Sequence, residues 1–167
     1  MILRGTAHRY GDDVDTDVII PATLLAARDP AYLARYCMTP LDPGFPDRVR
    51  PGDILVAGRN FGCGSSREHA VLALRGAGIA AVVAESIARI FFRNAINQGL
   101  PALVCPEAVA AVRPGDTVGV DVEAGTVTVG NRTFQAQPLP SGLREILAAG
   151  GLVNHVRARL GAAEGAG

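Results

Sequence analysis

Apolar residues fall into continuous runs along much of the chain, and these runs predict its central elements. Runs of four to seven apolar residues bounded by Gly, Pro or polar residues are typical of parallel strands buried on both faces. Three such runs occur, at 54–57, 78–84 and 100–105. Segments with helical spacing of apolar positions follow the first two, and a short helix is expected over 106–112 after the third. Strand and helix thus alternate, which predicts a parallel sheet built from βα units.

The pattern changes on either side of this central region. Apolar and polar residues alternate after Arg113, with turn residues between the runs, and this pattern predicts an antiparallel meander. The other expected elements are a strand over 2–10, a short helix over 31–37 with Pro30 in its first turn, a Pro-rich loop over 39–52, meander strands within 117–129 and over 132–137, and a last helix over 143–160 broken near 150–151.

These elements predict an α/β layered domain, with a parallel-type sheet beside an antiparallel meander. No internal repeat or interdomain linker is visible, so residues 1–160 are expected to form a single domain. The Gly/Ala-rich tail, residues 161–167, is expected to be disordered.

Composition excludes several classes of function. The net charge is zero and no basic patch is evident, which argues against nucleic acid as a partner. No apolar run approaches the roughly 20 residues needed to cross a bilayer. The N-terminus lacks the apolar core of a signal peptide, so we expect a cytoplasmic protein. The three cysteines, at 37, 63 and 105, form no C-x-x-C pair, which excludes a disulfide framework or a zinc knuckle.

All 16 basic residues are arginine. Schiff-base chemistry on lysine is therefore excluded, and arginine forks suit anionic substrates. A GC-rich coding sequence explains the same bias equally well, so this feature alone does not assign a substrate.

The stretch that offers chemistry lies between the first apolar run and the helix that follows it. It contains three glycines, at 58, 62 and 64, which permit positive φ and close approach of the backbone to a ligand. Ser65 and Glu68 have the spacing of a capping box, which predicts that the helix begins there. A Gly-rich loop followed by a helix N-terminus favours an anion site, and Arg67 is placed to bind a substrate carboxylate through two parallel hydrogen bonds.

Other Gly-rich motifs do not fit this stretch. A Walker loop requires Lys after its last glycine, whereas Ser65 follows Gly64 here. The dinucleotide fingerprint requires glycine where Arg67 stands, and neither serine fits the hydrolase G-x-S-x-G elbow. The acidic run that begins at Asp12 is not a calcium loop, because an EF-hand requires Gly at its sixth position, where this chain has Asp17.

Residues 60–69, Asn-Phe-Gly-Cys-Gly-Ser-Ser-Arg-Glu-His, closely resemble the signature of 3-isopropylmalate dehydratase small subunits, a family homologous to the mobile fourth domain of aconitase. The resemblance implies an aconitase-type swivelling domain with layers in the order β/β/α. It also implies a partner, the large subunit, which holds a [4Fe-4S] cluster through three cysteines of its own. This chain is then expected to bind no metal or cofactor itself.

The family isomerises 2-hydroxy dicarboxylic acids by removing water and adding it back at the neighbouring carbon. The resemblance implies that Ser65, as an alkoxide, takes the proton, and that Ser66, Arg67 and the backbone of Gly64 hold a substrate carboxylate. The alternative role of Ser65 is a plain helix N-cap, which stabilises a helix by about 1 kcal/mol; Ser66 would do the capping if Ser65 is catalytic. A thiolate nucleophile at Cys63 beside His69 is disfavoured, since no third orienting group is apparent.

Two further stretches extend the resemblance. Asp15-Thr16-Asp17, followed by Ile19-Ile20-Pro21, resembles the N-terminal motif of the family. It places Asp15 and Thr16 at the edge of the site; the alternative is an Asx turn that caps the next segment. Residues 86–99 resemble a second motif, in which Arg89 and Arg93 lie on one helix face and favour solubility or a partner surface over catalysis.

The segment 22–30 corresponds to the family's loop that contacts the variable substituent of the substrate. This chain has Leu24-Leu25-Ala26-Ala27 there, which departs from the family's usual residues. An arginine in the third place would pair with an extra carboxylate, and Ala26 cannot do so. An apolar wall favours an alkyl substituent such as isopropyl or methyl. Arg28 is a possible further residue at the site edge, and one of the two leucines is equally well explained as a core residue.

The resemblance therefore implies the small subunit of a hydro-lyase that converts 2-isopropylmalate to 3-isopropylmalate in leucine biosynthesis. A dehydratase for citramalate or dimethylmalate, or one of the homoaconitase type, is the enzymatic alternative. The alternative from another class is a non-catalytic carboxylate-binding module.

Overall fold

The structure, a computed structural model, describes residues 1–65 and 67–165. Its strands are β1 (Ile2–Arg9), β2 (Ile54–Ala57), β3 (Ala81–Ala84), β4 (Ala102–Val104), β5 (Thr117–Asp121), β6 (Thr126–Val129) and β7 (Arg132–Gln135). Its helices are α1 (Thr16–Ile19), α2 (Pro30–Ala34), α3 (Phe45–Arg48), α4 (His69–Gly76), α5 (Arg89–Asn97), α6 (Pro106–Ala111), α7 (Ser141–Ala148) and α8 (Leu152–Gly165), with a 3₁₀ turn, η1, over Ala22–Leu24.

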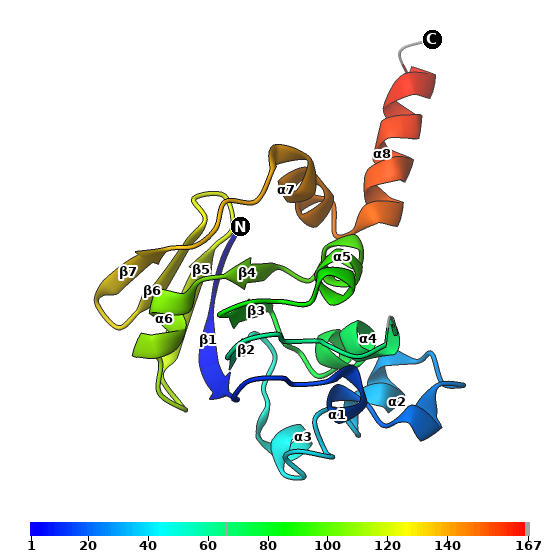
Figure 1. Cartoon of the computed structure of the whole chain (residues 1–167). Helices are drawn as coiled ribbons and strands as arrows, with labels where there is room; N and C mark the ends of the chain where they lie inside the picture. Colours follow the sequence, from blue (N-terminus) through cyan, green and yellow to red (C-terminus); the bar gives the residue numbers. More distant parts are fainter. Residues whose placement is uncertain (66, 166–167) are drawn as a thin grey trace.

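The strands form one mixed sheet in the order β4-β3-β2-β1-β5-β6-β7 (Figure 1). Strand β1 joins its two halves: Ile2 to Thr6 pair antiparallel with β5, and Ala7 to Arg9 pair parallel with β2. Both the parallel βα units and the antiparallel meander are thus confirmed. The two sheets expected from the family are the two halves of this continuous sheet.

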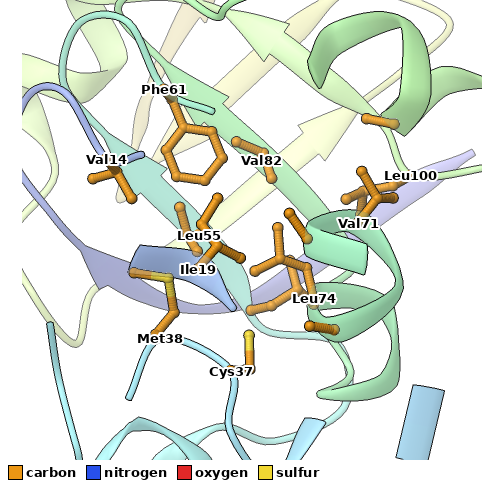
Figure 2. Close-up of a cluster of buried hydrophobic side chains, with 14 of the residues drawn as sticks. Val14, Ile19, Cys37, Met38, Leu55, Phe61, Val71, Leu74, Val82 and Leu100 are labelled. Carbon is orange, nitrogen blue, oxygen red and sulfur yellow. The ribbon is translucent and has the colours of Figure 1, made fainter. Parts of the chain in front are cut away.

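The parallel half is covered on both faces, as its uninterrupted apolar runs predict. Leu55 and Val82 point into a core shared with α4, whose Val71 and Leu74 lie in the same cluster (Figure 2). The opposite face of the same strands packs against the meander in a second cluster, which contains Ile54, Val56, Val83, Val118, Val120 and Val127. Helices, parallel strands and meander therefore form three layers, which is the β/β/α arrangement.

The boundaries differ from the expected ones in three places. The Pro-rich loop contains the one-turn helix α3, and α2 ends at Ala34 rather than Cys37. Helix α8 continues to Gly165, past the expected helix end at residue 160. The reason is composition: alanine has the highest helix propensity, and Ala162 and Ala163 extend the helix begun at Leu152. Helix α8 projects from the body of the domain (Figure 1).

Asp53, just before β2, fastens β1 to the parallel half. Its buried carboxylate accepts hydrogen bonds from the Thr6 and Arg50 N–H groups, at 3.3 and 2.9 Å, and lies 2.8 Å from His8 Nε2. Burial by itself raises the pKa of Asp53, but the bonds from His8 and the two N–H groups outweigh it and hold the pKa below its usual value.

This cluster predicts how stability depends on pH. Because the pKa of Asp53 is lower in the folded state, its stabilising effect is full above the unfolded value of about 4 and is lost as the pH falls through the folded-state value. We expect Asp53→Asn to lower the free energy of unfolding at pH 7 by about 1–2 kcal/mol, with a smaller deficit below pH 4. Urea unfolding of both proteins at pH 7 and pH 3.5 measures this; an equal deficit at both values would contradict it.

Candidate active site

Three loops meet at the carboxyl ends of the parallel strands, where α/β sheets usually bind ligands. They are residues 10–15 after β1, 58–68 after β2 and 85–88 after β3. We call residues 58–68 the signature loop. The Gly62 N–H donates to Val14 O at 2.8 Å, and the Ala88 N–H donates to Phe61 O at 2.9 Å. The signature loop is therefore held by backbone bonds on both sides.

Two glycines of the signature loop are required by its geometry. Gly62 has φ of +80°, and a Cβ there would lie 2.3 Å from the Phe91 ring. Gly64 has φ of +99°, and a Cβ there would lie 2.7 Å from both carboxylate oxygens of Asp15. The first glycine lets α5 pack behind the loop, and the second lets Asp15 approach its backbone.

Ser65, the expected base, is exposed, and its hydroxyl lies 3.3 Å from Thr16 Oγ1. Thr16 itself is 1% exposed, and its N–H donates to Cys63 O at 2.8 Å. A parallel β-bridge between Asp15 and Cys63 joins the same two segments. The structure thus brings Asp15 and Thr16 against the signature loop, where the motif predicted them. Asp15 also accepts from the Asp17 N–H at 2.7 Å, so the expected Asx cap exists as well.

The capping box predicted for Ser65 and Glu68 does not form. Helix α4 begins at His69, Glu68 is its N-cap in αR geometry, and that end has no side-chain cap. The positive φ of Gly64 and the contact of Ser65 with Thr16 hold the chain out of helical conformation until Glu68. The prediction that the helix starts at Ser65 is therefore wrong. The hydroxyl of Ser65 is not used for capping, which removes the alternative role of this serine.

Ser66, expected to hold a substrate carboxylate or to cap the helix, lies outside the described residues. Arg67 is described, and its Nη1 donates to a carboxylate oxygen of Asp17 in an ion pair. The side chain of Arg67 is 23% exposed and that of Asp17 is 58% exposed. Sequence reasoning missed Asp17 as a neighbour of Arg67, although its place in the Asp-Thr-Asp motif was an available signal.

The loop expected to contact the substrate's substituent lies beside the signature loop. Arg28 Nη1 is 4.0 Å from Glu68 Oε2, with both side chains largely exposed. Leu24 and Ala27 are partly buried against the core, so Leu24 is the leucine explained by packing. Leu25 is 39% exposed and Ala26 is exposed, which leaves these two to face a ligand or partner.

A thiolate nucleophile at Cys63 is disfavoured by its surroundings. Partial burial raises the pKa of the thiol, and the carboxylates of Asp15 and Asp13 raise it further. His69 is buried, and its Nε2 has no hydrogen-bond partner within residues 1–65 and 67–165.

Within the described chain, no group of three or more His, Cys, Asp or Glu side chains lies close enough to hold a metal ion. Cys37 and Cys105 are buried, and burial raises the pKa of each thiol. The donor set of this chain therefore does not fit an iron–sulfur cluster, which requires several converging thiolates. Among residues 1–65 and 67–165 no helix is long and apolar enough to cross a bilayer.

Comparison with known proteins agrees with this geometry. The aconitase C-terminal domain model matches residues 41–108. A 3-isopropylmalate dehydratase small subunit from Caldicellulosiruptor saccharolyticus is 52% identical over 162 residues, which are 96% of this chain and 94% of that protein. The crystal structure of 3-isopropylmalate dehydratase from Methanocaldococcus jannaschii superposes with a TM-score of 0.94 and 47% identity, covering 100% of both chains.

The chain belongs to the 3-isopropylmalate dehydratase small-subunit family. This chain is equally similar to a second kind of enzyme: the 2,3-dimethylmalate dehydratase small subunit of Eubacterium barkeri is 52% identical to it over 160 residues, 95% of this chain and 98% of that protein. Overall sequence identity therefore does not distinguish isopropylmalate from 2,3-dimethylmalate as the substrate. That distinction depends on the residues of the site.

The second motif of the family forms α5, which supports the site from behind. Phe91 packs edge-to-face on Phe61, with ring centroids 5.1 Å apart. Arg89 and Arg93 are exposed on another side of α5, where they line a small cavity of about 260 Å³ with Leu143 of α7. No contact within residues 1–65 and 67–165 links these arginines to Ser65, and their expected role at a partner surface stays a prediction.

Proposed function

We propose that this chain is the small subunit of a hydro-lyase that isomerises 2-isopropylmalate to 3-isopropylmalate in leucine biosynthesis. The observation that carries the proposal is the exposed Ser65 hydroxyl, held by buried Thr16 and released from helix capping, in the signature loop of this family. Arg67 lies two residues further on, where it suits a substrate carboxylate. The remaining half of the active site comes from the large subunit.

Ser65 acts as the base that takes the proton from the substrate carbon. A serine hydroxyl is a poor base in water, and a helix N-terminus contributes at most about 2 kcal/mol towards its anion, which is about 1.5 pKa units. Because α4 begins only at His69, its contribution here is smaller still. Arg67, the N–H groups of the signature loop and exclusion of water by the partner supply the rest, as in an oxyanion hole.

The proposal places a [4Fe-4S] cluster on the large subunit, because the thiols of this chain do not converge on a metal site. When bound there, such a cluster supplies a Lewis acid for the hydroxyl that leaves and returns. The contributions of this chain are proton removal at Ser65 Oγ, charge pairing at Arg67 and selection of the substituent by the loop at 24–28.

The loop favours isopropylmalate over substrates with a third carboxylate. Leu25 and Ala26 present exposed apolar groups, and the cation of the same loop, Arg28, is already close to the Glu68 carboxylate. An extra carboxylate buried against this loop would lack a partner, which is costly. The alternative substrate is 2,3-dimethylmalate, and the 52% identity to the Eubacterium barkeri protein favours it as the second candidate.

The test compares three unsaturated intermediates with the assembled enzyme. Isopropylmaleate has one more carbon than dimethylmaleate, worth roughly 0.8 kcal/mol when buried, so we expect kcat/KM for isopropylmaleate to exceed that for dimethylmaleate about 4-fold. Homoaconitate should be hydrated more slowly than either. Faster hydration of dimethylmaleate would assign the alternative, and tight binding of all three without hydration would favour a carboxylate-binding module.

A further inference from the structure

Three consecutive residues of α1 and its cap contact four positions of the signature loop in order. Asp15 forms the β-bridge to Cys63 and lies against Gly64. The remaining two contacts join Thr16 to Ser65 and Asp17 to Arg67, across separations of 49 and 50 residues. The short turn that follows β1 therefore touches the expected base and the expected anion-binding arginine separately.

The ion pair between Asp17 and Arg67 uses only part of the guanidinium. Arg67 Nη1 donates to Asp17, and within residues 1–65 and 67–165 this is the only hydrogen bond of the Arg67 side chain. A guanidinium carries five N–H donors in a planar fork, so with respect to residues 1–65 and 67–165 Nη2 and Nε remain for a carboxylate. Asp17 thus restrains the fork without occupying the two donors that a bidentate contact needs.

The position of Asp17 is itself fixed by the loop. Its N–H donates to Asp15 Oδ1 at 2.7 Å, and Asp15 is bridged to Cys63 of the signature loop. Thr16, between them, is buried against Ser65. The backbone of Asp17 is therefore tied to the signature loop, and this places the Asp17 carboxylate beside Arg67.

We propose that Asp17 is a positioning residue for the dehydratase reaction, and that it orients Arg67 so that the free edge of the guanidinium binds the substrate carboxylate. This inference rests on the proposed function. Arg67 binds the carboxylate equally before and during proton transfer, so an orienting residue behind it affects substrate binding. Loss of such uniform binding raises KM and leaves kcat nearly unchanged.

The experiment measures kcat and KM for isopropylmaleate hydration by the assembled enzyme with Asp17→Asn. We expect KM to rise roughly ten-fold and kcat to stay within about three-fold of wild type. Asp17→Ser, also uncharged, should behave in the same way, and Asp17→Glu should recover part of the affinity. Thermal unfolding of each variant chain is measured in parallel, and the large exposure of Asp17 predicts little change.

The matched control is Asp12→Asn. Asp12 accepts a hydrogen bond from the Arg59 N–H at 2.7 Å and pairs with the Arg59 guanidinium at 3.4 Å, so it also joins the segment after β1 to the signature loop, through exposed contacts that do not include Ser65 or Arg67. We expect its KM to remain at the wild-type value. An equal rise in KM for both variants would overturn the proposal, because it would show general loosening of the loops.

Two other results would overturn it. A fall in KM with Asp17→Asn would mean that Asp17 competes with the substrate for Arg67, and an effect confined to kcat would place Asp17 with the reacting groups. Failure of the proposed function gives a different result from these two kinetic outcomes, because the wild-type assembly would then hydrate no isopropylmaleate at all. In that case the role proposed for Asp17 would be overturned together with the proposed function.

Discussion

Ser65→Ala is expected to lower kcat for isopropylmaleate hydration by about 10²–10⁴-fold, the usual contribution of a positioned general base. KM should change little, because the hydroxyl acts on the substrate proton rather than on its carboxylates. The chain should fold normally, since Ser65 is exposed and its hydroxyl contacts only Thr16 within the described residues. Steady-state kinetics of the assembled enzyme measure both parameters.

The control for this variant is Ser141→Ala, which removes an exposed hydroxyl at the start of α7, away from the signature loop. We expect wild-type kinetics from it. Full activity in Ser65→Ala would instead reduce Ser65 to a structural residue of the loop and would remove the base from the proposed mechanism.

Gly62→Ala is expected to lower the free energy of unfolding by about 3 kcal/mol. The added methyl group would lie 2.3 Å from the Phe91 ring at a φ of +80°, so steric overlap adds to backbone strain. For a chain of this length the expected fall in Tm is about 6–12 °C. Differential scanning calorimetry or urea unfolding measures the effect.

Gly142→Ala is the matched control, and it is expected to change the free energy of unfolding in the opposite direction. Gly142 lies in the first turn of α7, and a Cβ there would meet no atom within 4 Å. Alanine should therefore stabilise the chain slightly, by at most the roughly 0.5–1 kcal/mol that it contributes in helix interiors. If Gly62→Ala were as stable as this control, the close packing of α5 behind the signature loop would be contradicted.

The parallel strands could be predicted from the sequence because burial on both faces of a strand produces a continuous apolar run. Runs such as 54–57 are apolar at every position, and only burial on both faces explains such a run. Alternation after Arg113 predicted the meander for the same reason. What the pattern could not give is that β1 serves both halves, since its partners lie more than 40 residues away.

Ser65 and Arg67 could be selected from local residue types, but their surroundings could not. The Ser-x-x-Glu spacing predicted a cap because that signal is local, whereas Gly64 and Thr16 determine the actual start of α4 at His69. The same limit hid the pairing of Arg67 with Asp17. Contacts between segments about 50 residues apart determine the geometry of this site, and the periodicity of apolar positions along the sequence does not predict such contacts.

The loop at 24–28 shows a third kind of limit. Helical or strand periodicity would have told which leucine faces the core, but the segment forms only a short 3₁₀ helix, η1, followed by a turn. With no sustained period, the inward position of Leu24 and the exposure of Leu25 emerge only from the folded chain.

The central claim is that this chain supplies half of an active site, and the most direct test is hydration of isopropylmaleate by the separate and mixed subunits. The cluster-loaded large subunit encoded in the same genome is assayed alone, the present chain is assayed alone, and the two are then combined at increasing ratios. The account predicts no turnover by either alone and a rate that rises with added chain until the large subunit is saturated. A mixture no faster than the large subunit alone, or turnover by this chain without its partner, would contradict it.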